Sequence, residues 1–224
     1  MAERGRPRRP RLDRDRVVAA ATALADEQGA AGVTMRAVAK RLGVEAMSLY
    51  NHVANREALL DGMVDAVFRE IDLPAPAADW RPAVRDHARS VRAALRRHPW
   101  AVGLLDSRGD PGPATLRRHD TLLGVLRSRG FSVPLAVRAL SVVDGYVYGF
   151  VLQELSLPFP DDAGMREVAG DILDSGPLGA YPHLAEVVAA QSSGHRYDPD
   201  EGFAFGLSLI LGALRPDEGT ADPE

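Results

Sequence analysis

Apolar residues recur every three or four positions along most of the chain, which predicts helices. The first helix follows Asp13, a residue type that suits a helix N-cap, and it ends at Gly29. A second, short helix follows Thr34 and stops at Gly43, and a third covers about residues 45–52. The apolar positions of the first two helices are Val17, Ala20, Ala21, Leu24 and Ala25, then Met35, Val38, Ala39 and Leu42.

The fourth predicted helix is longer, spans residues 55–71 and carries two neighbouring apolar rows. Asn55 is its expected N-cap. The two rows form a wide apolar stripe, so we expect this helix to pack on both sides. Their members are Leu59, Met63, Val67 and Ile71 in one row, and Leu60, Val64 and Phe68 in the other.

The segment at 73–82, LPAPAADWRP, contains three prolines and marks a boundary. No stretch alternates with period two for long enough to form a sheet, so the predicted fold class is all-α. Beyond the boundary, we predict helices at about 82–97, 112–129, 134–155, 165–174, 183–192 and 202–214.

The composition narrows the class of protein. The 224 residues include no cysteine, which excludes a disulfide framework, a thiolate zinc site and a cysteine nucleophile. The arginine-rich start has no apolar run behind it, so we expect no signal peptide and a cytoplasmic location. The most apolar stretch, 132–155, is interrupted by Pro134, Arg138 and Asp144, which favours a buried or interface helix over a membrane span.

The charge is distributed unevenly along the chain. The whole chain has a net charge of −4, but residues 1–60 hold 11 basic against 7 acidic side chains. A basic head on an acidic body indicates that one end meets a polyanion. Residues 1–11 are predicted to be a disordered basic arm, and their Arg4-Gly5-Arg6-Pro7 run could either read a minor groove or only add non-specific attraction.

Residues 34–53, TMRAVAKRLGVEAMSLYNHV, have the pattern of a helix-turn-helix. Two short helices that cross steeply need a turn residue that tolerates positive φ, and Gly43 supplies it. A small core can lock the pair against the first helix, formed by Val38, Ala39, Leu42, Leu49 and Val53. The outward positions of the second helix are small or polar, which suits a helix in a major groove. Basic side chains on the flanks would meet the DNA backbone; they are Arg36, Lys40, Arg41 and Arg56.

Residues 12–62 resemble the DNA-binding domain of the tetracycline-repressor (TetR) family. The resemblance rests on a run of fifteen residues at fixed spacing: Thr34, Arg36, Val38, Ala39, Leu42, Gly43, Val44, Leu49, Tyr50, His52, Val53, Asn55, Arg56, Leu59 and Leu60. It implies that Tyr50, His52 and Arg56 contact phosphates, whereas Arg36, Ala46, Met47, Ser48 and Asn51 face bases or the adjacent backbone. The complete predicted DNA-binding set is Thr34, Arg36, Ala46, Met47, Ser48, Tyr50, Asn51, His52 and Arg56.

Residues 130–154 are similar to the ligand-binding and dimerisation domain of the tetracycline repressors themselves. The resemblance implies a homodimer formed through helices at about 134–155 and 202–214. Those repressors bind the drug's magnesium with a histidine just before the helix at 112–129, and they have another histidine at the end of the fourth helix. This chain has Asp106 near the first place and no histidine at the second, so we expect no metal and no cofactor.

The predicted organisation is a basic arm (1–11), a three-helix DNA-binding domain (12–72), a helical ligand-binding and dimerisation domain (80–216) and a flexible tail (217–224). We expect a small apolar or aromatic effector. Candidate ligand contacts are apolar or aromatic side chains of the middle helices, each of which could instead be plain core or dimer interface: Trp100, Leu104, His119, Leu122, Leu123, Val125, Tyr146, Tyr148 and Phe150.

The predicted function is a ligand-responsive repressor that binds a palindromic operator as a homodimer. Two alternatives stay open: a DNA-binding regulator without a small-molecule ligand, and an activator. Catalysis is disfavoured because the chain has no Gly-x-Ser-x-Gly, phosphate loop or His-Glu-x-x-His. Asp144, inside an apolar helix, could pair within the dimer, with Arg138 or with the ligand.

Overall fold

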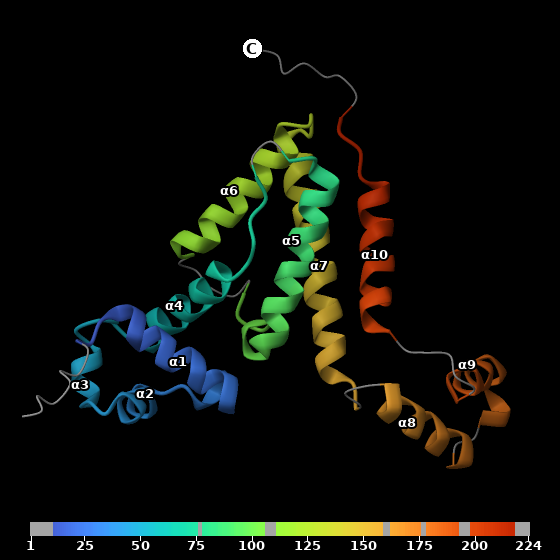
Figure 1. The fold of residues 1–224 in the computed structure, drawn as a ribbon, viewed down its shortest axis with the longest axis horizontal. Helices are drawn as coiled ribbons and strands as arrows, with labels where there is room; N and C mark the ends of the chain where they lie inside the picture. Colours follow the sequence, from blue (N-terminus) through green and yellow to red (C-terminus); the bar gives the residue numbers. More distant parts are fainter. Residues whose placement is uncertain are drawn as a thin grey trace, which may run out of the picture. The chain divides into compact units, whose positions relative to one another are not determined.

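The computed structural model describes residues 11–75, 78–105, 111–158, 162–175, 178–192 and 198–217. These residues form helices and contain no strand, which confirms the all-α class (Figure 1). The predicted basic arm, Asp106 and nearly all of the predicted C-terminal tail lie outside them. The α-helices are α1 (Arg14–Gln28), α2 (Met35–Leu42), α3 (Ala46–Leu49), α4 (Arg56–Arg69), α5 (Trp80–Arg97), α6 (Pro113–Arg127), α7 (Val133–Ser156), α8 (Asp162–Ser175), α9 (Pro182–Ser192) and α10 (Pro199–Ala213). Three short 3-10 helices are η1 (Ala30–Gly32), η2 (Pro99–Ala101) and η3 (Leu178–Ala180).

The predicted caps set the ends of the first helices. Asp13 accepts a hydrogen bond from the N–H of Arg16 at 2.8 Å, and Asn55 accepts one from Ala58 at 2.8 Å. Thr34 caps α2 through the N–H of Ala37 at 3.1 Å. These side chains satisfy N–H groups that have no partner inside the helix, which is why each helix begins where the sequence predicts.

The chain divides into two compact units, Met1–Arg129 and Gly130–Glu224. The first unit therefore includes α5 and α6 together with the four N-terminal helices. Both of these helices pack against α4. The break in packing thus falls at Gly130, whereas the proline-rich boundary of the sequence falls at 73–82. The limits 12–72 for the DNA-binding domain and 80–216 for the ligand-binding and dimerisation domain remain a prediction.

In the first unit, the three N-terminal helices and α4 enclose one hydrophobic core. Val38, Ala39, Leu49 and Val53 are buried in it, as the helix-turn-helix pattern predicts, and Leu42 is half-buried. The remaining fully buried side chains come from α1 and α4, among them Val17, Ala21, Leu24, Leu59 and Met63. This core fixes α2 and α3 on a rigid base.

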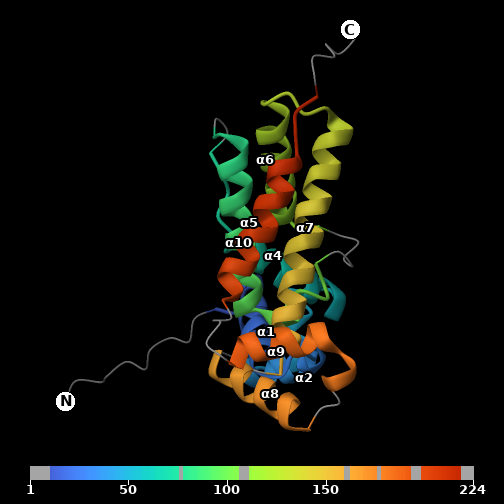
Figure 2. The same ribbon diagram turned by 90° about the vertical axis from the view of Figure 1, so that its right-hand side faces the viewer.

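In the second unit, α7 and α10 pack along each other (Figures 1 and 2). Phe203, Leu207 and Leu211 of α10 are buried and stand four residues apart, so they form one face of that helix. Tyr146 of α7 stacks on Phe203 with ring centroids 5.5 Å apart. Its hydroxyl donates to the carbonyl of Phe203 at 2.9 Å. α8 and α9 pack mainly on each other.

Candidate nucleic-acid interface

The turn between α2 and α3 has the geometry that the sequence predicts. Gly43 has φ +67° and ψ +38°, in the left-handed region that favours glycine. The N–H of Val44 then donates back to the carbonyl of Ala39 at 3.0 Å, which closes the end of α2. This turn brings α3 out across α2, so the two helices form a helix-turn-helix.

α3 is shorter than the predicted range of 45–52. Its α-helical part ends at Leu49, and the next N–H groups bond three residues back, from Tyr50 to Met47 and from His52 to Leu49. Only the N–H of Val53 returns to a four-residue step. Tyr50, Asn51 and His52 therefore lie on a tighter turn than the helix predicted for them.

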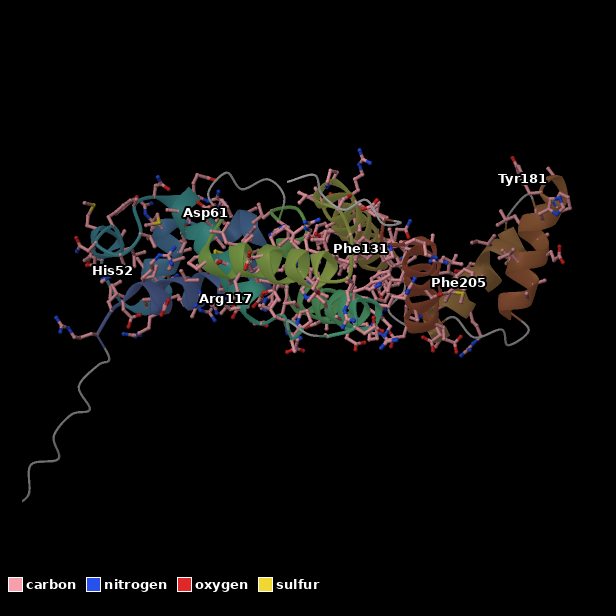
Figure 3. The ribbon with its side chains drawn as sticks, turned by 90° about the horizontal axis from the view of Figure 1, so that it is seen from above. His52, Asp61, Arg117, Phe131, Tyr181 and Phe205 are labelled. Carbon is pink, nitrogen blue, oxygen red and sulfur yellow. The ribbon has the colours of Figure 1, made fainter. Side chains whose placement is uncertain are left out.

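The predicted DNA contacts on α2, α3 and the turn after α3 differ in exposure. Met47 is 74% exposed, Tyr50 is 46% exposed, and Arg36 and Asn51 are also exposed. Of the other predicted contacts on this helix and its turn, Ala46, Ser48 and His52 are half-buried (Figure 3 labels His52).

Thr34 has two roles open to it. Its Oγ1 accepts the capping hydrogen bond from Ala37, and the residue is exposed. A hydroxyl group donates one hydrogen bond in addition to accepting. Thr34 can therefore cap α2 and still donate to a phosphate oxygen.

The resemblance implies that Arg56 contacts a phosphate, but in this structure its guanidinium also bonds within the protein. Its Nε donates to the carbonyl of Val33 at 2.8 Å, and its Nη2 donates to the carbonyl of Ala30 at 3.0 Å. Its Nη1 lies 3.6 Å from a carboxylate oxygen of Glu57. The guanidinium therefore fastens the start of α4 to the segment between α1 and α2.

A second flanking cation is also paired within the protein. Arg41 makes a bidentate ion pair with Glu27 of α1, with both nitrogen–oxygen distances 2.7 Å. This hydrogen bond lowers the pKa of Glu27 and raises that of Arg41. Arg41 thus ties α2 to α1. A DNA phosphate at Arg41, as predicted, would have to share the guanidinium with Glu27.

Six of the predicted ligand-binding residues lie in the first unit. Trp100 donates from its indole N–H to Asp26 of α1 at 2.6 Å, and both Trp100 and Leu104 pack against the core of the N-terminal helices. On α6, Leu122 and Val125 are buried, Leu123 is half-buried and His119 is exposed. Trp100 and Leu104 therefore contribute to the packing of the N-terminal helices, and a role for them toward a ligand remains a prediction.

The other three predicted ligand residues lie on α7 in the second unit. Tyr146 and Phe150 pack on each other and on Phe203 of α10. A Cβ atom at Gly206 would overlap with the Tyr146 ring, so that glycine admits the ring. Tyr148 and Asp144 are half-buried on α7. Tyr146 and Phe150 are thus contacts between α7 and α10, and a role for these residues toward a ligand remains a prediction.

Two polar clusters that the sequence pattern did not single out bind the helices of the first unit together. Asp65 of α4 is 6% exposed and accepts hydrogen bonds from the main chain of α6. His98, after α5, contacts carboxylates of α1 and α4. No sequence signal could have found them, because their partners are 28 to 72 residues away.

The glycine turn, the buried base under α2 and α3 and the exposed outer side chains define a helix-turn-helix DNA-binding protein. Residues 17–63 match the family model described as bacterial regulatory proteins, tetR family. Residues 73–216 match the tetracyclin repressor-like, C-terminal domain. The chain therefore belongs to the TetR family and is a transcriptional repressor of this family.

Named relatives agree over most of the chain. The HTH-type transcriptional repressor DrrR1 of Streptomyces coeruleorubidus is 36% identical, over 92% of this chain and 78% of that protein. The tetracycline repressor protein class A from transposon 1721 of Escherichia coli is 33% identical, with 91% of each chain covered. The crystal structure of Streptomyces coelicolor ActR in complex with actinorhodin is similar in fold, with a TM-score of 0.75, 28% identity and coverage of 90% of this chain and 94% of that chain.

Proposed function

We propose that this protein acts as a homodimer that occupies a near-palindromic operator and leaves it when a small molecule binds. Two recognition helices would enter successive major grooves, roughly 34–36 Å apart. The observation that carries the proposal is the exposed face of α3 and its turn, supported from below by a fully buried core. The protein would work in the cytoplasm as a regulator rather than as an enzyme.

Base recognition by this face would be partly apolar. Ala46 and Met47 have no hydrogen-bonding groups suited to base edges, so they favour a thymine methyl group. Asn51 can pair with an adenine, and Arg36 can reach guanine or phosphate. Tyr50, His52 and the hydroxyl of Thr34 would donate to phosphate oxygens.

The proposed dimer interface is the outer surface of α7 and α10. Phe205 is 67% exposed and Leu209 is 59% exposed, on the face of α10 opposite its buried row (Figure 3 labels Phe205). α7 exposes Val133, Val137, Val142, Leu152 and Leu155. An exposed apolar surface of this kind is typical of a protein interface, and in a symmetric dimer the same surface of a second copy would bury it.

α7 by its length and composition could also cross a membrane, and a third of its most apolar window is buried. We favour the dimer because Arg138 and Asp144 interrupt the helix and because its buried face packs on α10. Charged groups inside a lipid span are costly, whereas at a dimer surface they can stay hydrated or paired.

The proposed effector is a small apolar or aromatic molecule, and the complex of ActR with actinorhodin supports by analogy that the C-terminal domain binds a small molecule. It would have to bind better to a conformation whose heads are wrongly spaced for the operator, because only differential affinity shifts a population. α4 is the proposed lever, since it packs on α1, α5 and α6. Two hollows of the first unit, of about 230 and 300 Å³, contain none of the predicted ligand residues.

The first test is selection of bound DNA from a random pool by the purified protein at two salt concentrations. A recovered palindrome with half-sites about one helical turn or more apart supports a dimeric operator-binding protein. That site then serves to screen effectors by loss of binding. Weak, steeply salt-dependent binding with no motif would contradict the proposal, since it would show only general affinity for a polyanion.

A further inference from the structure

His98 is the residue at which three elements of the first unit meet. It ends α5 and precedes η2, and its side chain is only 10% exposed. Its Nδ1 lies 2.7 Å from Oδ1 of Asp26, at the C-terminal end of α1. Its Nε2 lies 3.2 Å from Oε1 of Glu70, the C-cap of α4.

Both ring nitrogens of His98 therefore face carboxylate oxygens. An ionised carboxylate only accepts hydrogen bonds, so each contact requires an N–H on the imidazole. A neutral imidazole has one N–H and one lone pair, whereas the imidazolium has two N–H groups. The arrangement is thus complete only when the ring carries its second proton.

The groups around the ring hold the two carboxylates in place. Oδ1 of Asp26 also accepts the indole N–H of Trp100, from η2, at 2.6 Å. Glu70 accepts from Nη2 of Arg97, on α5, at 2.9 Å. The charged groups that face His98 are therefore Asp26 from α1 and Glu70 from α4, with Arg97 of α5 behind Glu70.

We propose that His98 is a positioning residue of the operator-binding head, and that its protonated form clamps the ends of α1 and α4 to the turn after α5. Loss of the second proton would leave a ring lone pair facing one carboxylate, and one of the two contacts would open. The clamp would therefore loosen as rising pH removes that proton.

The clamp would affect operator binding through the orientation of the head. α1 supports α2 and α3, and α4 joins them to α5 and α6. A head held in one orientation loses less freedom on binding DNA, so the clamped state should have the higher affinity. This inference rests on the proposed operator binding. Operator affinity should fall as pH rises, on the order of fivefold, at the low end of coupling between sites.

Trp100 offers a direct optical readout, because its indole shares Asp26 with the His98 ring. The chain has two tryptophans, and Trp80→Phe leaves Trp100 as the single emitter. We expect Trp100 fluorescence to change with pH in one transition, and operator affinity to change with the same midpoint. If Trp80→Phe does not fold, the fluorescence of Trp100 is obtained by difference. The pH titration of Trp100→Phe is then subtracted from that of the unaltered chain.

The variants separate the clamp from other sources of pH dependence. Affinity is measured in a His52→Gln background, because that imidazole lies on the DNA-facing turn. There, His98→Gln should remove the Trp100 transition and hold the affinity at its weak, high-pH level. His183→Gln, on exposed α9, is the matched control and should leave both transitions intact.

Two results would overturn the inference. A Trp100 transition that survives His98→Gln would assign the titration to another group. An operator affinity that stays flat while Trp100 titrates would show that the clamp does not position the head. In both cases intact operator binding would leave the proposed function standing, whereas absence of sequence-specific binding at every pH would overturn both proposals.

Discussion

The carboxylate of Asp65 on α4 accepts a hydrogen bond from the main-chain N–H of Ala114 on α6, with Oδ1 and N 2.8 Å apart. The same oxygen accepts the N–H of Thr115 at 3.1 Å, and Oδ2 lies 3.8 Å from Nε of Arg69. The N-cap of α6 is Gly112, which has no side chain to satisfy these N–H groups. A buried acid from another helix therefore caps α6, where an anion also matches the helix dipole.

This cross-helix cap should contribute measurably to the free energy of unfolding. Asp65→Ala would leave two partly buried N–H groups without their acceptor, and we expect a loss of about 1–3 kcal/mol in urea unfolding. Gly112→Ala should cost a similar amount, because its Cβ would overlap with the Asp65 carboxylate.

Gly124→Ala on the same helix is the matched control for the glycine substitution. Nothing lies within 4 Å of its Cβ position, so it should stabilise α6 by up to about 1 kcal/mol. Equal effects of the two glycine substitutions would show that the close approach of Asp65 to Gly112 has no energetic importance.

Arg56→Ala should lower the stability of the N-terminal helices and have little effect on contacts with DNA phosphates. It removes the two hydrogen bonds to the carbonyls of Val33 and Ala30, which we expect to cost about 1–2 kcal/mol in thermal or urea unfolding. Operator affinity would then fall with little change in its salt dependence. A decrease of about one in the slope of log affinity against log salt would instead identify Arg56 as a phosphate contact.

Met47→Ala should weaken operator binding without changing stability, because this side chain is mostly exposed in the free protein. We expect a loss of about 1 kcal/mol if Met47 contacts a thymine methyl. The matched experiment replaces operator thymines by deoxyuridine one at a time. One replacement should weaken binding to the unaltered protein and have no effect on Met47→Ala. If the two effects add at every position, the methyl contact is absent.

Phe205→Glu combined with Leu209→Glu should yield monomers in sedimentation. Both side chains lie on the exposed face of α10, and burying two carboxylates at an apolar interface is strongly unfavourable. Leu116→Glu, which introduces a charge at an exposed apolar position of α6, should leave the dimer intact. Persistent dimers of the double variant would place the interface elsewhere.

The ion pair of Glu27 with Arg41 should make a pH-dependent contribution to the stability of the head. The hydrogen bond lowers the pKa of Glu27 in the folded state below its ordinary value of 4.5. The stabilisation is therefore present above that ordinary pKa and is lost as pH falls through the lowered one. The difference in Tm between the unaltered chain and Glu27→Gln should be small and constant near neutral pH, since the pair is exposed, and should vanish in acid. A difference that persists unchanged in acid would contradict this assignment.

The sequence determined the elements that depend on local chemistry. Asp13, Thr34 and Asn55 cap their helices and Gly43 turns the chain because these effects involve neighbours three or four residues away. The same periodicity placed Val38, Leu49 and Leu59 in the core. The spacing of the helix-turn-helix residues also sufficed to predict the TetR family.

Only the tertiary structure decided which polar groups meet across the fold. Arg56 bonds to carbonyls 23 and 26 residues away, and Asp65 caps a helix 49 residues further on. The sequence did not show that the indole of Trp100 donates to Asp26 or that Tyr146 packs on α10. Periodicity shows which face of a helix is apolar, but it does not show which other helix covers that face. That choice depends on how the helices pack together, because a side chain takes its role from neighbours that are distant in sequence.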